Sequence, residues 1–319
     1  MVTNQDLHDE FPNWDIDRVV KKSGVLKRHI ATKNETALDL SIKACEKLFS
    51  NESKEDIDGI IYCTQSPDYI MPSNCFFLQD HLNLSEDIFA LDFNHACTGY
   101  IYSLAIAHSF LLSGLGRKIL LVNADTYSKY INKNDRSTRV LFGDGAAVSI
   151  IESTKSQSGI IDIDLASRGK GYDKFWIQAG GLRIPKSKET SVELRDKSGN
   201  VRSKNDITMD GMEVWSFINS VAPKQILSLL ERNNLNKSEV SLFIFHQASK
   251  MTLDSLMRIL QLENDQFFTN IKEIGNTVSA SIPIAIKDAM DQGKLKKGQH
   301  VVLSGFGVGL SYGTILMKI

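Results

Sequence analysis

Three side chains in the sequence have types and settings that suit the chemistry of thioesters. Cys97 lies between a strand-like run and a predicted helix. A helix N-terminus offers free N–H groups and a partial positive charge, and both favour the nucleophilic thiolate. His246 ends an apolar strand, at the carboxyl edge where α/β sheets place their sites. Asn276 lies at another predicted junction between a strand and a helix.

Each of these residues also has a simpler interpretation. Cys97 could be a buried structural thiol, His246 a core histidine with satisfied hydrogen bonds, and Asn276 a helix N-cap. Together, however, they supply a nucleophile for a thioester and two donors for a developing oxyanion or enolate. The glycine-rich segment Gly305–Gly309 can add backbone N–H groups.

The composition is that of an ordinary globular protein, with 42% hydrophobic and 24% charged residues among 319. A net charge of −1 argues against a nucleic-acid or anionic-membrane partner. No cysteine pair has CxxC or metal-type spacing, which predicts free thiols in a reducing compartment and no metal site. No apolar run is long enough to span a membrane, and the first twenty residues contain no signal-peptide core, so we expect a cytoplasmic protein.

The elements that must position these residues occur twice in the same order. The matching segments are the helices 34–49 and 215–233, the strands 59–64 and 241–246, the helices 97–112 and 277–290, the strands 118–123 and 300–304, and the final segments 143–151 and 305–319. Any α/β protein alternates in this way, but the similar spacings favour a duplication with largely parallel sheets. We expect halves at 1–155 and 156–319. A loop-rich insert at about 168–210 could cover a substrate entrance.

Five motifs resemble, in order, those of β-ketoacyl-acyl carrier protein synthase III, a condensing enzyme of the thiolase superfamily. They are Asn94–Gly99, Phe142–Ala147, His246–Ala248, Gly275–Ser281 and Gly305–Gly309, and Gly24–Ile30 extends the resemblance over nearly the whole chain. The combination of cysteine, histidine and asparagine separates this class from its relatives. Thiolases use a second cysteine, elongating synthases a second histidine, and hydroxymethylglutaryl synthases a glutamate. The resemblance implies an α/β fold of duplicated α-β-α-β-α layers with mixed five-stranded sheets. The family's opening strand is missing before Thr3–Leu7, which suggests a longer native N-terminus.

The resemblance also implies a mechanism. Cys97 would accept an acyl group from a thioester of coenzyme A or acyl carrier protein, and a malonyl thioester would then bind and lose carbon dioxide. His246 and Asn276 would hydrogen-bond the thioester oxygen as the enolate forms. The backbone N–H groups of Cys97 and Val308 would form the oxyanion hole. No permanently bound cofactor and no metal would be needed.

The resemblance also implies roles for residues at the entrance to the site and at the acyl pocket. Lys22, Arg136 and Lys250 match or replace basic residues at the acyl-donor entrance, although exposed basic residues are usually only solvated. Arg18 stands where many members have a tryptophan that stacks on the adenine of coenzyme A, so a carrier protein could be the preferred donor. Met71 falls at the position where a loop of one subunit of a homodimer gates its partner's acyl pocket, but it could also be a core methionine.

The sequence is also compatible with two alternative functions. An acyltransferase of the same fold would move the acyl group from Cys97 to an oxygen or nitrogen atom of a sugar or secondary metabolite, and Arg18 would suit such an acceptor. Asn276 argues against it, because stabilising an enolate is the task of that amide. A non-catalytic partner subunit would have lost the cysteine, which is present here.

Overall fold

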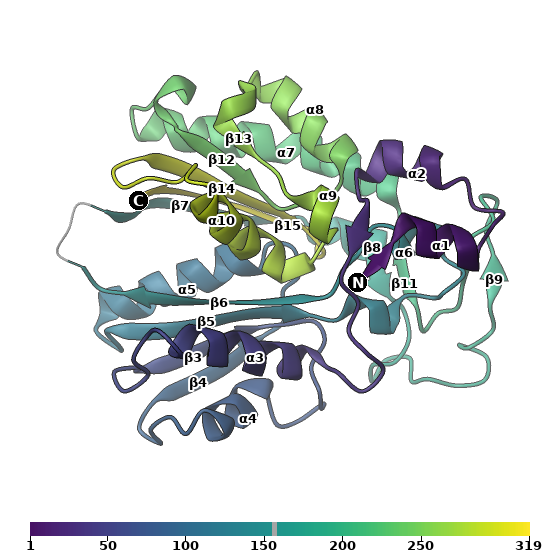
Figure 1. Cartoon of the computed structure of the whole chain (residues 1–319), viewed down its shortest axis with the longest axis horizontal. Coiled ribbons are helices and arrows are strands. Elements are labelled where there is room, and N and C mark those ends of the chain that lie inside the picture. The colour runs from purple at the N-terminus through teal and green to yellow at the C-terminus, as the bar shows by residue number, and fades with distance from the viewer. Residues whose placement is uncertain (155–157) are drawn as a thin grey trace.

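A computed structural model describes residues 1–154 and 158–319 and contains two mixed sheets (Figure 1). The first sheet has the order β4-β3-β5-β6, in which β4, β3 and β5 are parallel and β6 is antiparallel. Its strands are β3 (Gly59–Cys63), β4 (Phe89–Phe93), β5 (Lys118–Asp125) and β6 (Gly145–Glu152).

The second sheet repeats this order and adds one strand. Its order is β13-β12-β14-β15-β7, and β15 and β7 are the antiparallel members. The strands are β7 (Gly159–Ser167), β12 (Leu242–Phe245), β13 (Phe267–Phe268), β14 (His300–Gly307) and β15 (Ser311–Lys318). In the second sheet β7 lies beside β15, but within the described residues no strand lies beside β6 at the corresponding edge of the first sheet. This open edge agrees with the prediction that the first strand is missing. The predicted boundary at 155/156 lies outside the described residues.

The two sheets alternate with three layers of helices: one outer pair covers each sheet, and a central pair lies between the sheets. These five layers confirm the predicted fold class. The central pair is α5 (Gly99–Ser113) and α10 (Ser281–Asp291), whose apolar side chains pack with those of both sheets. A helix covered on both sides is apolar all round, as α5 is. The first sheet is covered by α3 (Ala37–Phe49) and α4 (Asn74–His81), and the second by α7 (Gly211–Arg232) and α8 (Lys250–Leu260) (Figure 1).

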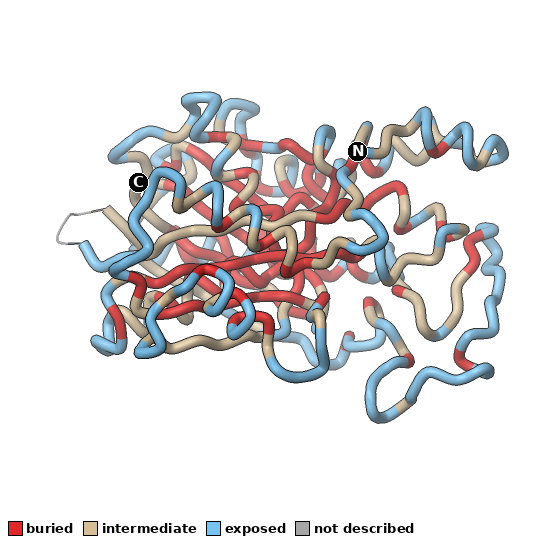
Figure 2. Tube along the Cα trace, turned by 60° about the horizontal axis from the view of Figure 1, so that its bottom comes forward, coloured by how far each residue is buried: buried red, intermediate tan, exposed pale blue. Residues whose placement is uncertain are grey.

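The central strands consist of consecutive apolar residues because helices cover both faces of each sheet. All four residues of β12 are buried, and so are all five of β3. Figure 2 shows this buried interior together with the largely exposed outer loops. None of the helices in the described residues is long and apolar enough to cross a bilayer.

The smaller elements gather at one end of the molecule (Figure 1). In the insert, residues 168–210, β9 and β10 form a short hairpin, as predicted, whereas β8 pairs with β11 from the other end of the insert. The bounds of the small elements are β1 (Val2–Thr3), α1 (Asn4–Glu10), α2 (Ile16–Ser23), β2 (Lys27–Arg28), α6 (Arg136–Arg139), β8 (Phe175–Ile177), β9 (Leu194–Arg195), β10 (Val201–Arg202), β11 (Ile207–Met209) and α9 (Ile271–Ile274).

Candidate active site

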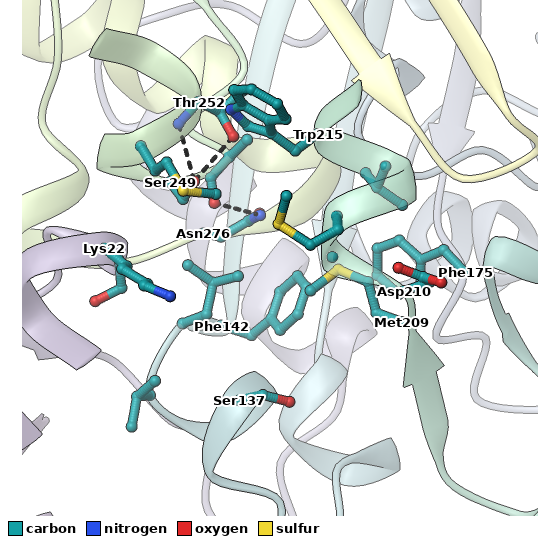
Figure 3. Close-up of a pocket in the computed structure, with 18 of the residues that line it drawn as sticks. Lys22, Ser137, Phe142, Phe175, Met209, Asp210, Trp215, Ser249, Thr252 and Asn276 are labelled. Carbon is teal, nitrogen blue, oxygen red and sulfur yellow. Dashed lines mark hydrogen bonds between the residues drawn. The ribbon is translucent and has the colours of Figure 1, made fainter. Parts of the chain in front are cut away.

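One cavity of about 840 Å³ contains all three residues that the sequence predicts to be catalytic. Cys97, His246 and Asn276 line it, and their exposed fractions are only 3%, 1% and 4%. Figure 3 shows Asn276 in this pocket with Phe142 and Trp215 around it. The first half supplies the cysteine, and the second supplies the imidazole and the amide. The structure therefore brings the three side chains together, and their roles remain predictions.

Cys97 lies in the turn between β4 and α5, and glycines make room for its sulfur. A Cβ atom on Gly307 would lie 2.7 Å from the Cβ and 2.9 Å from the Sγ of Cys97. A Cβ atom on Gly99 would lie 2.4 Å from the sulfur of Cys63, so the first turn of α5 also needs glycine. The close approach of β14 to this turn explains why glycine recurs in the segment after Ser304.

The electrostatic surroundings of Cys97 differ from the sequence-based expectation. Burial raises the pKa of the thiol well above its ordinary value, and the Asp125 carboxylate raises it further. The backbone N–H groups of Cys97 and Val308 hydrogen-bond the sulfur and lower the pKa, but they do not offset burial. The resting group is a thiol rather than the thiolate that the helix N-terminus predicted. A base must therefore remove its proton during acyl transfer.

His246 has the protonation state that such a base requires. It follows β12, and its backbone N–H donates to the carbonyl oxygen of Ser304 at 2.8 Å. Burial lowers the pKa of the imidazole to about 3, which keeps the ring neutral near pH 7. Its Nδ1 lies 2.6 Å from the hydroxyl oxygen of Ser281, the first residue of α10. A hydroxyl both donates and accepts, so Ser281 can support either ring tautomer and leave Nε2 as an acceptor or as a donor.

Asn276 is held by the opposite half of the molecule. Its backbone N–H donates to the carbonyl oxygen of Leu141 at 2.9 Å, and its carbonyl oxygen accepts from the N–H of Gly143 at 2.9 Å. The side-chain Oδ1 accepts from the N–H of Val278 at 2.9 Å, whereas Nδ2 makes only a 3.4 Å bond to the carbonyl of Ala248. The amide oxygen thus fixes the local turn, but Asn276 is not an N-cap, because Thr277 caps the following helical turn and Ala280 caps α10. The NH₂ group of Asn276 retains donor capacity for a ligand.

Asp125 is a positioning residue that the sequence analysis missed. The turn after Asn276 contains Val278 at φ +53°, a strained conformation for a β-branched residue. The fully buried Asp125 carboxylate accepts from the N–H (3.2 Å) and hydroxyl (2.5 Å) of Ser279, and from the N–H of Gln65 at 2.8 Å. These bonds tie the strained turn to the first half. Asp125 could have been found from the sequence by its position just after the predicted strand 118–123.

The predicted entrance residues divide into two groups. Lys22 and Arg136 line the cavity, as does Arg18. Lys250 does not, because its side chain pairs with Asp254 and its Cβ packs against Gly24. Met71 lies outside the cavity and is 79% exposed, so it is not a core methionine in the single chain. The functions of these residues remain predictions.

Trp215 is a further wall residue that the sequence analysis did not single out. It lines the cavity, and its indole Nε1 is buried without a hydrogen-bond partner in the part of the chain that the structure describes. Such a group is free to donate to a bound ligand. The described residues contain no group of three or more histidine, cysteine and carboxylate side chains placed to hold a metal ion.

The raised pKa of Cys97 predicts how the sulfur reacts with an alkylating agent. Below its pKa, the thiolate fraction of a thiol rises about tenfold for each pH unit. Alkylation of Cys97 by iodoacetamide should therefore accelerate from about pH 6 to about pH 9 without a plateau, as measured by peptide mass spectrometry. Cys45 and Cys75 are fully buried outside the cavity and should stay unmodified. A plateau near neutral pH would mean that the resting group is a thiolate.

Comparisons with known proteins agree over the whole chain. Residues 91–169 match the family model described as 3-oxoacyl-[acyl-carrier-protein (ACP)] synthase III, and residues 230–319 match the model for its C-terminal part. The β-ketoacyl-[acyl-carrier-protein] synthase III of Clostridium perfringens strain 13 is 35% identical over 100% of this chain and 95% of its own length. The corresponding protein of Fusobacterium nucleatum is 34% identical over 97% and 94%.

Solved structures show the same similarity. A crystal structure of a 3-oxoacyl-(acyl-carrier-protein) synthase III is 35% identical and superposes with a TM-score of 0.97 over 100% of this chain and 95% of that one. The synthase III of Thermus thermophilus is 31% identical, with a TM-score of 0.88 and coverage of 100% and 95%.

Proposed function

Because the chain belongs to the β-ketoacyl-[acyl-carrier-protein] synthase III family, it is a condensing acyltransferase, and we propose that it works through an acyl group held on Cys97. The observation that carries this proposal is the shared, buried cavity of Cys97, His246 and Asn276. It unites a nucleophile, a neutral imidazole and an amide donor, which are the groups that acyl transfer and enolate formation need.

In the first step, the Cys97 sulfur attacks the carbonyl carbon of an acyl thioester. The proton of the thiol passes to Nε2 of His246, which the Ser281 hydroxyl supports in the acceptor tautomer. The N–H groups of Cys97 and Val308, which already point at the sulfur, stabilise the tetrahedral oxyanion. The carbon–sulfur bond to the donor breaks, and the proton on His246 passes to the departing thiol.

In the second step, a malonyl thioester replaces the departed thiol. Its carboxylate leaves as carbon dioxide, and the electron pair of the broken carbon–carbon bond forms an enolate. Nε2–H of His246 and Nδ2 of Asn276 hydrogen-bond the enolate oxygen, and Ser281 now donates to Nδ1. The enolate carbon attacks the acyl carbonyl, and the bond to Cys97 breaks. The 3-oxoacyl thioester is released, and the thiolate takes up a proton.

The substrates in this proposal are thioesters of coenzyme A and acyl carrier protein, and no resident cofactor takes part. The loss of carbon dioxide makes the condensation favourable without redox chemistry. All four cysteines are buried free thiols, which fits a reducing compartment, and we place the protein in the cytoplasm on that basis.

The decisive test of the proposed function measures carbon dioxide and product together. With an acyl thioester and malonyl-acyl carrier protein, the protein should release one carbon dioxide for each 3-oxoacyl-acyl carrier protein that forms. The alternative transferase would pass its acyl group to an oxygen or nitrogen acceptor and release none. Turnover of the acyl-enzyme without malonyl-dependent carbon dioxide would refute the condensation.

We also propose a homodimer that forms through the face around β4 and α4. Ile70 and Met71 are 98% and 79% exposed, and Phe76 and Phe77 of α4 are exposed beside them. The outer edge of β4 has no strand partner among the described residues. An exposed apolar patch next to an open strand edge is typical of a self-association surface. A monomer mass in sedimentation equilibrium would exclude this dimer.

A further inference from the structure

The hydroxyl group of Thr98 does not have the role that its position suggests. Thr98 is the N-cap of α5, where a threonine hydroxyl usually accepts a hydrogen bond from the first turn of the helix, but it makes no such bond here. Thr98 is fully buried, and its Oγ1 lies 2.7 Å from the hydroxyl oxygen of Ser311 in β15 and 3.1 Å from Nδ1 of His95. It therefore connects a histidine two residues before Cys97 with the second half of the molecule.

The same series of hydrogen bonds continues to the proposed oxyanion hole. The Ser311 hydroxyl donates to the carbonyl oxygen of Val308 at 2.8 Å, and the N–H of Val308 hydrogen-bonds the Cys97 sulfur. A glycine lies on each side of Val308, and glycine leaves the backbone unusually free. A bond from outside the turn therefore limits how the peptide groups of Val308 are oriented. We call this series of groups the hydroxyl chain: Nδ1 of His95, Oγ1 of Thr98, Oγ of Ser311 and the carbonyl oxygen of Val308.

The number of protons in the hydroxyl chain determines the tautomer of His95. The chain has three links, and each link needs one proton between its two heavy atoms. The two hydroxyl groups supply two protons and the carbonyl oxygen supplies none, so the third proton must be on Nδ1 of His95. If Nδ1 lacked it, Thr98 would donate to the ring instead. Ser311 could then donate either to Thr98 or to Val308, and one link would be lost.

The ring of His95 is held where this donor is needed. It stacks on Tyr102 of α5 with ring centroids 4.1 Å apart and planes at 22°. Its backbone carbonyl oxygen accepts from the sulfur of Cys63 at 3.2 Å. Burial lowers the pKa of the imidazole, which favours a neutral ring near pH 7. A neutral ring has one N–H, and the hydroxyl chain places it on Nδ1.

We propose that His95 is a positioning residue that orients the oxyanion-hole N–H of Val308 through the hydroxyl chain. The inference rests on the proposed function, because in that mechanism the Val308 N–H stabilises the tetrahedral oxyanion. His95 itself does not line the catalytic cavity, whereas His246 does. Loss of the His95 donor should therefore slow the attack on the acyl thioester without changing how that thioester binds.

The experiment uses variants that separate the donor from the ring. His95→Phe keeps an aromatic ring for the stack on Tyr102 but has no donor. His95→Asn loses the ring, but its amide can donate from a position close to that of Nδ1. Thr98→Val breaks the hydroxyl chain in its middle. The matched control is His8→Phe, because His8 is an exposed residue of α1 outside the cavity. The rate of acyl loading on Cys97 is followed by intact-mass spectrometry.

The donor, and not the ring, should determine the loading rate. One ordinary hydrogen bond is worth a factor of roughly three to ten, so His95→Phe should lower kcat for loading by about that factor with KM unchanged. His95→Asn should restore most of the rate. Thr98→Val should lose at least as much as His95→Phe, and combining the two should cost nothing further, because the chain is already broken. His8→Phe should load like the wild type.

The tautomer can be measured without any chemical step. In protein with nitrogen-15-labelled histidine, NMR correlations between ring protons and ring nitrogens show which nitrogen carries the proton. The signals of His95 are those missing from the spectrum of His95→Phe, and they should show Nδ1–H near pH 7.

Three results would overturn this proposal. The first is an Nε2–H tautomer at His95, and the second is a wild-type loading rate in His95→Phe. The third is a loss in His95→Asn as large as that in His95→Phe, which would assign the effect to the ring. If the wild type loads from no acyl thioester, the proposed function fails, and the NMR spectrum still tests the hydroxyl chain.

Discussion

Replacing Cys97 by alanine is expected to abolish acyl loading and all condensation that depends on it. In the proposed mechanism the sulfur forms the covalent bond to the acyl group, and Cys97 is the one cysteine among the described residues that line the cavity. Removing a nucleophile that acts together with a base typically costs about a thousandfold or more. Intact-mass spectrometry after mixing with an acyl thioester should show the adduct on the wild type and none on Cys97→Ala.

The other cysteines provide matched controls for this experiment. Cys45→Ala removes a thiol that is equally buried but lies outside the cavity, in the core around α3, and it should load like the wild type. Cys63 is the nearest competing thiol, since it lies against Gly99, but its sulfur donates to the carbonyl oxygen of His95 and does not line the cavity. An unchanged adduct on Cys97→Ala would exclude Cys97 as the nucleophile.

The layers of the fold could be predicted because their physical cause is local in the sequence. Short apolar runs mark strands that are covered on both faces, and the observed β3, β5, β12 and β14 begin within one residue of the predicted strands. The repeat of these runs indicated the duplication. Amphipathic surface helices such as α8 were not identified, because one polar face breaks the run and no chemistry drew attention to them.

The composition of the candidate site could be predicted from the sequence, but its detailed geometry could not. Cys97, His246 and Asn276 were recognised from their positions after strands, where parallel sheets place their sites. Two aspects depend on contacts between distant segments and have no local signature. One is the bond between Asp125 and Ser279, 154 residues apart, which ties down the turn after Asn276. The other is the burial of Cys97, which outweighs the helix N-terminus and keeps the sulfur protonated.

Glycines at the junction of the halves connect the sequence motifs with the position of Asn276. A Cβ atom on Gly143 would lie 2.5 Å from the carbonyl oxygen of Ile274, and one on Gly275 would lie 2.9 Å from that of Leu141. Gly275 also has φ +70°, which glycine adopts without strain. The backbones on each side of Asn276 can approach only because these residues have no side chain. The motifs thus encode the contact between the halves as well as the chemistry.

Asn276→Asp should separate the two chemical steps. The change replaces the NH₂ donor by a carboxylate oxygen at the point where the enolate gains negative charge. Losing one such donor usually costs roughly 10²–10³-fold in rate, and the repulsion of a second anion adds to this. In the proposed mechanism acyl loading relies on the N–H groups of Cys97 and Val308 instead, so it should fall by less than about tenfold. Carbon dioxide release from malonyl-acyl carrier protein and adduct formation on Cys97 measure the two steps separately.

The local structure makes aspartate the informative substitution at this position. The retained oxygen can still accept from the N–H of Val278 and so preserve the strained turn, whereas Asn276→Ala would lose that bond and the donor together. Asn51→Asp adds the same charge at an exposed site outside the cavity and should leave both steps unchanged. Equal losses of loading and decarboxylation in Asn276→Asp would show that the amide positions the cavity as a whole rather than the enolate. A larger loss in Asn276→Ala than in Asn276→Asp would assign the main role to the Val278 bond.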